Sequence, residues 1–388
     1  MKEAVIVSVA RTPVGKRGQS LAAIEAPVLG AMAMQKAVER ANIDPATIDE
    51  VIFGNLFNFN YGNLARIAVL KAGFPISVPA ITIDRQCSSS LNAVALGASL
   101  IMTGACETVL CGGVESYSKR PLLIKRPESA YPMQLEFTEL SVSTPEIGDP
   151  PMIMTAENLA KKYNLCREEL DAFALESHKK AAAAWDRGFY DEEVFPIELP
   201  QKKGAPIIFS RDECVRGDAS MESMARLKPV LLKDGVVTAA NSSPMNDGAS
   251  AIMLMSRERA LELGLEPLAK VTGFASAGVD PNIMGIGPVY STRKLMQKMS
   301  LTIDDFDIIE LNEAFAAQSL ACARELNIDM SRLNPNGGAI AIGHPNAASG
   351  GILLCRTVRH MKQQNLKRGL ISFCCGGGQG FSLVVERN

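Results

Sequence analysis

One cysteine stands where a strand gives way to a helix, a position that can turn a thiol into a nucleophile. In residues 81–97, ITIDRQCSSSLNAVALG, the β-branched residues Ile81–Ile83 predict a strand and the apolar run from Leu91 predicts a helix, which the three serines after Cys87 could cap. The N–H groups and dipole at a helix start favour a thiolate, so we expect a pKa below the value of about 8.5 of a free cysteine. The alternative is that Cys87 is a small buried apolar residue.

An internal repeat pairs this cysteine with a histidine. Asn55 of VIFGN aligns with Asn312 of IIELN. Residue 344, which lies as far after Cys87 in the sequence as Asn312 lies after Asn55, is a histidine. His344 lies in NGGAIAIGHPNAASGG, again at a turn before a predicted helix. If the two halves pack about a pseudo-twofold axis, the two helix starts meet, and a cysteine beside a histidine is an activated nucleophile with its base. A structural histidine next to Pro345 is the alternative.

Strands that alternate with helices must position these two residues. Strand patterns over 4–10, 50–56 and 108–113 alternate with helix patterns over 26–41 and 64–72. This alternation favours an α/β fold with a largely parallel sheet.

The alternation is lost in the middle of the chain. From Tyr117 to about Met154 the sequence is proline-rich, and two helix patterns follow it. The second is polar and alanine-rich, typical of a surface element, so we expect His178 on it to be solvated, as we do His360 in a charged helix end. The next irregular stretch contains four basic residues, Lys202, Lys203, Arg211 and Arg216. Each alone is ordinary solvated charge, but together they could serve an anionic ligand.

Composition narrows the function classes. The chain has 388 residues, a net charge of −2 and a hydrophobic fraction of 47%, which gives no electrostatic case for a nucleic-acid partner. No apolar run is long enough to span a membrane, and Met1 leads almost directly into the strand pattern AVIVSVA, so we expect neither a membrane span nor a signal peptide. Nine cysteines without CxxC spacing predict reduced thiols, no disulfide framework and no metal site, in a cytoplasmic protein.

Seven sequence blocks, taken in order along the chain, resemble the thiolase family. They are RQCSSS at 85, CGGVES at 111, TAEN at 155, VTAANSSPMNDGAS at 237, LNEAFAAQ at 311, NPNGGAIAIGHP at 334 and CCGGGQG at 374. The resemblance implies a five-layered α-β-α-β-α fold with two similar halves and an inserted loop domain. The expected bounds are 1–116 plus about 240–265 for the N-terminal half, 117–239 for the inserted domain and 266–388 for the C-terminal half.

The resemblance also implies reversible acyl transfer between thioesters of coenzyme A, with roles for particular residues. Cys87 matches the acylated nucleophile and His344 its activating base. The second cysteine, the acid or base at the substrate's α-carbon, stands two residues before the triple glycine, which makes it Cys374 and not Cys375.

Two sites for oxyanions follow from the same resemblance. Asn312 matches the residue that holds a water molecule, which with His344 binds the thioester oxygen of the second substrate. The backbone N–H groups of Cys87 and Gly376 match a second oxyanion site, where small residues let the backbone come close.

Binding residues are carried over in the same way. Phe315, Met152 and Ser243 match positions that line the acyl and pantetheine pocket, and Arg216 matches a position near the nucleotide end of coenzyme A. The chemistry implied calls for no metal and no permanently bound cofactor, since coenzyme A is substrate and product. The partners implied are acyl-CoA, CoA and a second copy of the chain, in a homodimer or homotetramer.

Several positions depart from the family pattern beside the site. Asp84 stands where Asn is usual, and Ser90 and Ala240 stand where Gly is usual. After the GHP motif the chain reads Asn346-Ala347 in place of an apolar residue and Gly.

Two further departures bear on substrate length. Pro151 and Ile153 flank Met152, where some short-chain members carry His and Gly. Because Ile153 takes up acyl space, we favour short substrates, with acetoacetyl-CoA first. The alternatives are a longer-chain 3-ketoacyl-CoA thiolase, a non-catalytic acyl-CoA or lipid-binding protein of this fold, and a decarboxylating condensing enzyme, against which Cys374 argues.

Overall fold

The computed structural model describes residues 2–127 and 135–387, so residues 128–134 of the expected inserted domain lie outside the described residues. The N-terminal half contains six strands and four helices. In chain order these are β1 (Ala4–Arg11), β2 (Gly15–Lys16), α1 (Ala26–Ala41), β3 (Glu50–Gly54), α2 (Leu64–Lys71), β4 (Ala80–Ile83), α3 (Ser89–Met102), β5 (Thr108–Ser116), β10 (Asn246–Ser256) and α7 (Arg257–Glu262).

The C-terminal half repeats this plan. Its elements are β11 (Ala269–Gly278), α8 (Gly287–Met299), β12 (Ile308–Leu311), α9 (Ala316–Leu326), α10 (Ala339–Ile342), α11 (Ser349–Gln364), β13 (Arg368–Cys375) and β14 (Gln379–Glu386). Helices α1, α8, α9 and α11 each end on a residue in the left-handed conformation, which closes the helix without glycine.

The strand order shows the repeat directly. It runs β12-β13-β14-β11-β1-β10-β5-β3-β4, so β11, β14, β13 and β12 on one side mirror β1, β10, β5 and β3 on the other. The two halves join through a short antiparallel contact of Val5 with Lys270 and Ile6 with Ala269. The internal repeat predicted from the sequence is therefore confirmed.

The expectation of a largely parallel sheet is wrong. Parallel pairing is confined to β3 with β4 and β5, and β12 with β13. In each half the remaining neighbours pair antiparallel, as in β5 with β10, β10 with β1, β13 with β14 and β14 with β11. The sheet is mixed because neither β5 and β10 nor β13 and β14 are joined by a single crossover helix. The inserted region connects the first pair, and a tight hairpin connects the second.

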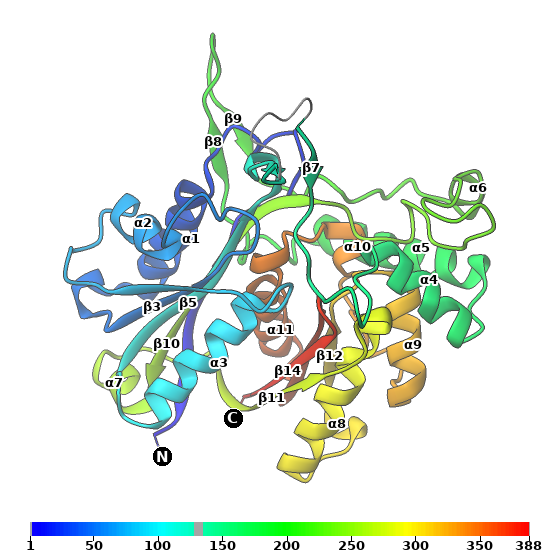
Figure 1. The fold of residues 1–388 in the computed structure, drawn as a ribbon. Helices are drawn as coiled ribbons and strands as arrows, with labels where there is room; N and C mark the ends of the chain where they lie inside the picture. The colour runs from blue at the N-terminus through cyan, green and yellow to red at the C-terminus, as the bar shows by residue number, and fades with distance from the viewer. Residues whose placement is uncertain (1, 128–134, 388) are drawn as a thin grey trace.

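Five layers stack across the molecule (Figure 1). Helices α1 and α2 cover the outer face of the N-terminal strands, α8 and α9 cover that of the C-terminal strands, and α3 and α11 lie between the two sets of strands. This confirms the five-layered fold. It also explains why α3 is rich in small apolar residues, since a helix packed on several sides has little room for long side chains.

The two central helices touch at their N-terminal ends. The N–H of Gly351 donates to the Ser90 hydroxyl at 2.9 Å, and a Cβ at Gly350 would lie 2.5 Å from the backbone nitrogen of Leu91. Glycine is therefore required at position 350 for this close approach.

The region expected to be an inserted loop domain has its own small elements. These are β6 (Leu123–Ile124), β7 (Phe137–Thr138), α4 (Met152–Lys162), α5 (Arg167–Asp186), β8 (Ile197–Leu199), β9 (Ile207–Phe209) and α6 (Met221–Ala225). The β8–β9 hairpin projects from the body, whereas α4 and α5 lie against the C-terminal half beside α9 (Figure 1). Among the described residues, no helix combines the length and apolar character needed to cross a membrane.

Candidate active site

Cys87 lies in a tight turn between β4 and α3. Gln86 before it has a left-handed backbone with φ of 49°, which is strained for a residue other than glycine, and its N–H is held by the Asp84 carboxylate at 2.6 Å. The hydroxyls of Ser88 and Ser89 donate to carbonyls of this turn, so the expectation that these serines cap α3 is wrong. They stabilise the turn that presents the thiol instead.

The thiol of Cys87 has a higher pKa than the sequence predicted. Burial raises the pKa of Cys87 to about 11 and outweighs three groups that act in the opposite direction. These are the side-chain amide of Asn346 and the backbone N–H groups of Gly376 and of Cys87 itself. The helix start supplies donors as expected, but residues of the second half of the chain, among them Asn346 and Gly376, lie against the sulfur and leave Cys87 only partly exposed.

His344 is a buried, neutral imidazole. Its Nδ1 lies 2.7 Å from the Ser349 hydroxyl, which in turn lies 3.0 Å from the Pro345 carbonyl. Since that carbonyl can only accept, the hydroxyl donates to it and accepts from Nδ1–H, which assigns the free lone pair to Nε2. Burial lowers the pKa of His344 to about 4, so at neutral pH Nε2 is a proton acceptor.

The repeat brings Cys87 and His344 to the same place. The side-chain amide of Asn346, two residues after His344, donates to Cys87 Sγ at 3.4 Å. Within the part of the chain that the structure describes, no hydrogen bond joins the imidazole directly to the sulfur. The predicted meeting of the two helix starts is thus confirmed, while the direct Cys–His hydrogen bond is not formed.

The two neighbouring cysteines of β13 face opposite sides of the strand. Cys374 belongs to an apolar cluster with Phe315, whereas Cys375 belongs to the core around the central helices, and its thiol donates to the Ser88 hydroxyl at 3.1 Å. Burial, followed by the nearby Cys87, raises the pKa of Cys374 well above its usual value. Both cysteines are therefore close to Cys87, which packs with the core cluster of Cys375, whereas Cys374 faces the apolar cluster of Phe315.

The glycine loop and β12 complete the surroundings of the sulfur. The N–H of Gly376 points toward Cys87, and Gly377 and Gly378 follow with positive φ of 77° each, which makes the tight hairpin from β13 to β14. Asn312 follows β12, fully buried, with its side-chain nitrogen 3.5 Å from Nε2 of His344.

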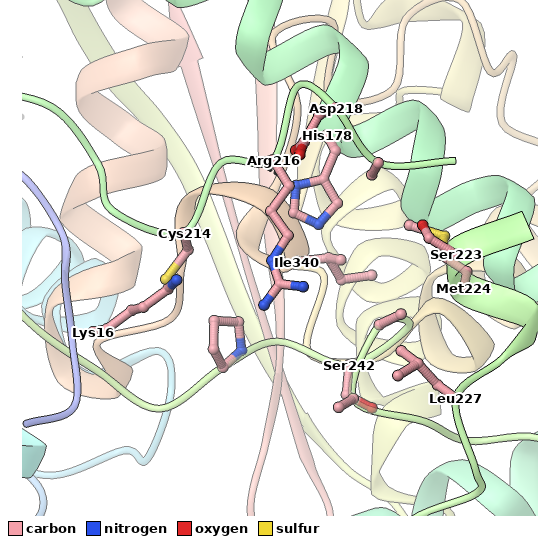
Figure 2. A pocket seen from close by; sticks show the side chains of 14 residues that line it. Lys16, His178, Cys214, Arg216, Asp218, Ser223, Met224, Leu227, Ser242 and Ile340 are labelled. Carbon is pink, nitrogen blue, oxygen red and sulfur yellow. Dashed lines mark hydrogen bonds between the residues drawn. The ribbon is translucent and has the colours of Figure 1, made fainter. Parts of the chain in front are cut away.

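A cavity of about 400 Å³ lies near this region, although none of Cys87, His344, Asn312 and Cys374 is among the described residues that line it. Arg216 extends its guanidinium into the middle of it, between Lys16 on one side and Ser242 on the other (Figure 2). Ala240 and Ile340 also line it, and both pack with the cluster that contains Cys374. A volume of this size, with apolar residues and the two cations Lys16 and Arg216 in its wall, suits an anionic ligand.

The other predicted binding residues, Met152, Phe315 and Ser243, are not among the residues that line this cavity. Met152 at the start of α4 and Phe315 before α9 both pack in the cluster of Cys374. The cavity wall contains Ser242 and Pro244, whereas the hydroxyl of Ser243 between them donates to the Ala314 carbonyl at 3.0 Å.

Sequence reasoning misplaced two histidines and missed part of the cavity. His178 is only 5% exposed, lines the cavity, and accepts a hydrogen bond from the Arg216 N–H at 3.2 Å. His360 is also partly buried, against Asn336 at 3.1 Å. Both were expected to be solvated. Lys16 also lines the cavity. No sequence motif identified it as a binding residue, because the cavity forms only when segments far apart in the chain come together.

Comparison with known proteins agrees with this geometry. The chain matches the family models "Thiolase, N-terminal domain" over residues 4–258 and "Thiolase, C-terminal domain" over residues 265–387. It is 46% identical to an acetyl-CoA acetyltransferase of Cupriavidus necator over 392 residues, with 100% of both chains covered.

Solved structures of thiolase-fold enzymes superpose on almost the whole chain. The crystal structure of the Bacillus anthracis acetyl-CoA acetyltransferase has a TM-score of 0.95 at 39% identity and covers 100% of this chain and 99% of that chain. Human mitochondrial 3-ketoacyl-CoA thiolase in complex with CoA has a TM-score of 0.94 at 36% identity and covers 100% and 98%. Matches to both family models across nearly the whole sequence leave one conclusion, that this chain belongs to the thiolase family.

Proposed function

We propose that the chain catalyses reversible CoA-dependent cleavage and Claisen formation of 3-ketoacyl-CoA through an acyl-cysteine. One observation carries this proposal: the thiol of Cys87 lies at a helix start with Cys374 beside it and the Gly376 N–H directed at its sulfur. Two thiols next to a backbone donor suit a reaction that needs a nucleophile, a second proton carrier and an oxyanion site. Relatives named acetyl-CoA acetyltransferase support it.

The first half-reaction transfers the acyl group to Cys87. The thiol gives its proton to Nε2 of His344, and the sulfur attacks the thioester carbonyl of acyl-CoA. The N–H groups of Cys87 and Gly376 hold the oxyanion that forms. The carbon–sulfur bond to CoA then breaks, and the departing thiolate takes the proton from His344. Since one thioester replaces another, the step is nearly isoenergetic.

The second half-reaction forms the carbon–carbon bond. Cys374 in its thiolate form removes a proton from the α-carbon of a second acyl-CoA and becomes a thiol, and the resulting enolate attacks the acyl carbon on Cys87. The enolate oxygen is bound by His344 and by a water molecule on Asn312. In support of this water site, Asn312 Oδ1 is buried without a hydrogen-bond partner among the described residues. The bond from the acyl carbon to the Cys87 sulfur then breaks, Cys87 leaves as a thiolate, and it takes up the proton that Cys374 received, which returns both cysteines to their starting forms.

The cavity around Arg216 is the proposed entrance for coenzyme A. The guanidinium lies where an anionic nucleotide end would need a cation, and the apolar residues that continue toward Cys374 suit the pantetheine and acyl parts. Met152, Phe315 and Ser243 are the further residues proposed to border this path. None of these steps calls for a metal or another cofactor.

Acyl length is the finer part of the proposal, and we assign short substrates, with acetoacetyl-CoA first. Ile153 packs against the cluster that contains Cys374 and Phe315, so its side chain fills space next to the reacting groups. A glycine at this position would leave that space to a longer acyl chain.

A cytoplasmic homodimer or homotetramer is the proposed form of the protein. All nine cysteines are free thiols, as a reducing compartment requires. The outermost strand β4 carries Ile81, which is 49% exposed, and Ile76 just before it is 82% exposed. An apolar sheet edge of this kind suits a second copy of the chain, which light scattering after size exclusion tests.

The experiment that tests the function is CoA-dependent cleavage of 3-ketoacyl-CoAs from acetoacetyl-CoA upward, with the products separated by chromatography. We expect cleavage with a maximum of kcat/KM at the shortest substrate. Binding of acyl-CoA without turnover would instead identify a non-catalytic protein, turnover that requires loss of CO₂ would identify a decarboxylating condensing enzyme, and a maximum at long chains would identify the longer-chain alternative.

A further inference from the structure

A side chain outside the matched catalytic set contacts the nucleophile. The amide nitrogen of Asn346 donates to Cys87 Sγ at 3.4 Å. The backbone N–H groups of Gly376 and Cys87 also lower the pKa of the thiol, but with a smaller effect than the Asn346 amide. Asn346 stands at a position where the thiolase pattern has an apolar residue without a donor.

The segment that carries Asn346 is held in place from two sides. The short 3₁₀ turn η5 (Asn346–Ala348) is fixed by the Ala347 N–H, which donates to the buried Glu115 carboxyl at 3.2 Å. The Ala347 carbonyl lies against Gly113, where an added Cβ would be only 2.1 Å away. The donor on Asn346 is therefore presented by a backbone that cannot shift without disturbing β5.

A donor at this position distinguishes the forms of the sulfur. A thiolate is a strong hydrogen-bond acceptor, whereas a thiol and the sulfur of a thioester are weak ones. A fixed amide N–H therefore stabilises the free thiolate and the transition states in which the sulfur carries negative charge. Burial raises the pKa of Cys87, and among the groups that lower it the Asn346 hydrogen bond is the largest. His344 is neutral and adds no positive charge.

We propose that Asn346 is a further catalytic residue of this chain, which donates its side-chain N–H to the Cys87 sulfur and so favours the thiolate that attacks acyl-CoA. This inference rests on the proposed function, in which Cys87 is the nucleophile. It gives the departure from the family pattern at position 346 a chemical role.

Other ionisable groups also act on the sulfur and must stay constant in a test. Glu115 of β5 and Cys374 and Cys375 of β13 interact with Cys87 directly, whereas Asp84 and Arg85 of the turn before α3 act on Glu115 and Cys375, and the neutral His344 precedes η5. A substitution at Asn346 leaves all of them in the chain, so a change in the pH profile of Cys87 reports the loss of the amide.

The experiment measures alkylation of Cys87 by iodoacetamide between about pH 6 and 10, with mass spectrometry to assign the label. The variants are Asn346→Leu, which removes the donor at similar volume, and Asn346→Ala, which removes it and opens the site. Asn60→Leu makes the matched change at an exposed position and should leave the profile unaltered.

We expect both Asn346 variants to alkylate roughly tenfold more slowly at each pH below the pKa of Cys87, and to form acetyl-Cys87 from acetyl-CoA more slowly by a similar factor. Easier access of iodoacetamide to the sulfur would make alkylation of Asn346→Ala faster, whereas loss of the amide donor would make it slower, so the two effects have opposite signs. A profile of the folded Asn346→Leu variant that coincides with the wild type would overturn the proposal, because this variant loses the donor without opening the site. Alkylation does not depend on any reaction of CoA. If the chain cleaved no 3-ketoacyl-CoA, the proposed function would be refuted, but the alkylation rates would still show whether Asn346 stabilises the Cys87 thiolate.

Discussion

Replacing Cys374 with serine should separate the two half-reactions. Cys374 is fully buried near Cys87, and a serine hydroxyl in its place stays protonated at neutral pH, so it has no base form to take a proton from a substrate α-carbon. Loss of a general acid or base costs about 10²–10⁴ in rate, or about 3–5 kcal/mol in the barrier. We expect thiolysis and condensation to fall by that factor, while acetylation of Cys87 by acetyl-CoA changes only a few-fold.

Cys375→Ser is the matched control for this experiment. The thiol of Cys375 already donates to the Ser88 hydroxyl at 3.1 Å, so a serine keeps a partner and turnover should stay near the wild-type value. Rapid-quench acetylation and steady-state thiolysis are measured for both variants, together with thermal unfolding, since a buried hydroxyl without a partner costs about 1–3 kcal/mol of stability. Loss of turnover in Cys375→Ser with normal turnover in Cys374→Ser would refute the assignment.

Two further predictions concern specificity and pH. Ile153→Gly should shift the kcat/KM profile over C4 to C16 substrates toward longer chains by about tenfold, and an unchanged profile would show that Ile153 only packs. Burial raises the pKa of the Glu115 carboxyl to about 8, so its contribution to stability is present at low pH and is lost as the pH rises through about 8. Glu115→Gln should therefore remove a fall of about 2 kcal/mol in the free energy of unfolding between about pH 6.5 and 8. The histidines titrate equally in both proteins and cancel in the comparison, so an equal fall in the variant would contradict this. Urea unfolding at several pH values makes the measurement.

Local patterns predicted most of the elements, because each is encoded by its own residues. The sequence placed α1 at 26–41, as the structure has it, and the repeat placed Cys87 and His344 together. The direction of pairing was missed because β5 pairs with β10, which lies beyond the inserted region. The glycine run Gly376–Gly378 between two strand patterns was a usable sign of an antiparallel hairpin.

What depends on packing between distant segments could not be predicted in the same way. The raised pKa of Cys87 results from burial by the C-terminal half, which the helix-start argument leaves out. His178 reads as a surface residue on α5 until the segment around Arg216 folds over it. Lys16 reaches the cavity from the other end of the chain, with no motif of its own.

The most direct test of the central claim is to incubate the protein with acetyl-CoA alone and to locate the label by mass spectrometry of its peptides. A nucleophilic Cys87 predicts one acetyl group on this residue, released by added CoA, and no label in Cys87→Ser. An acetyl group on another cysteine, with Cys87 unmodified, would contradict the account.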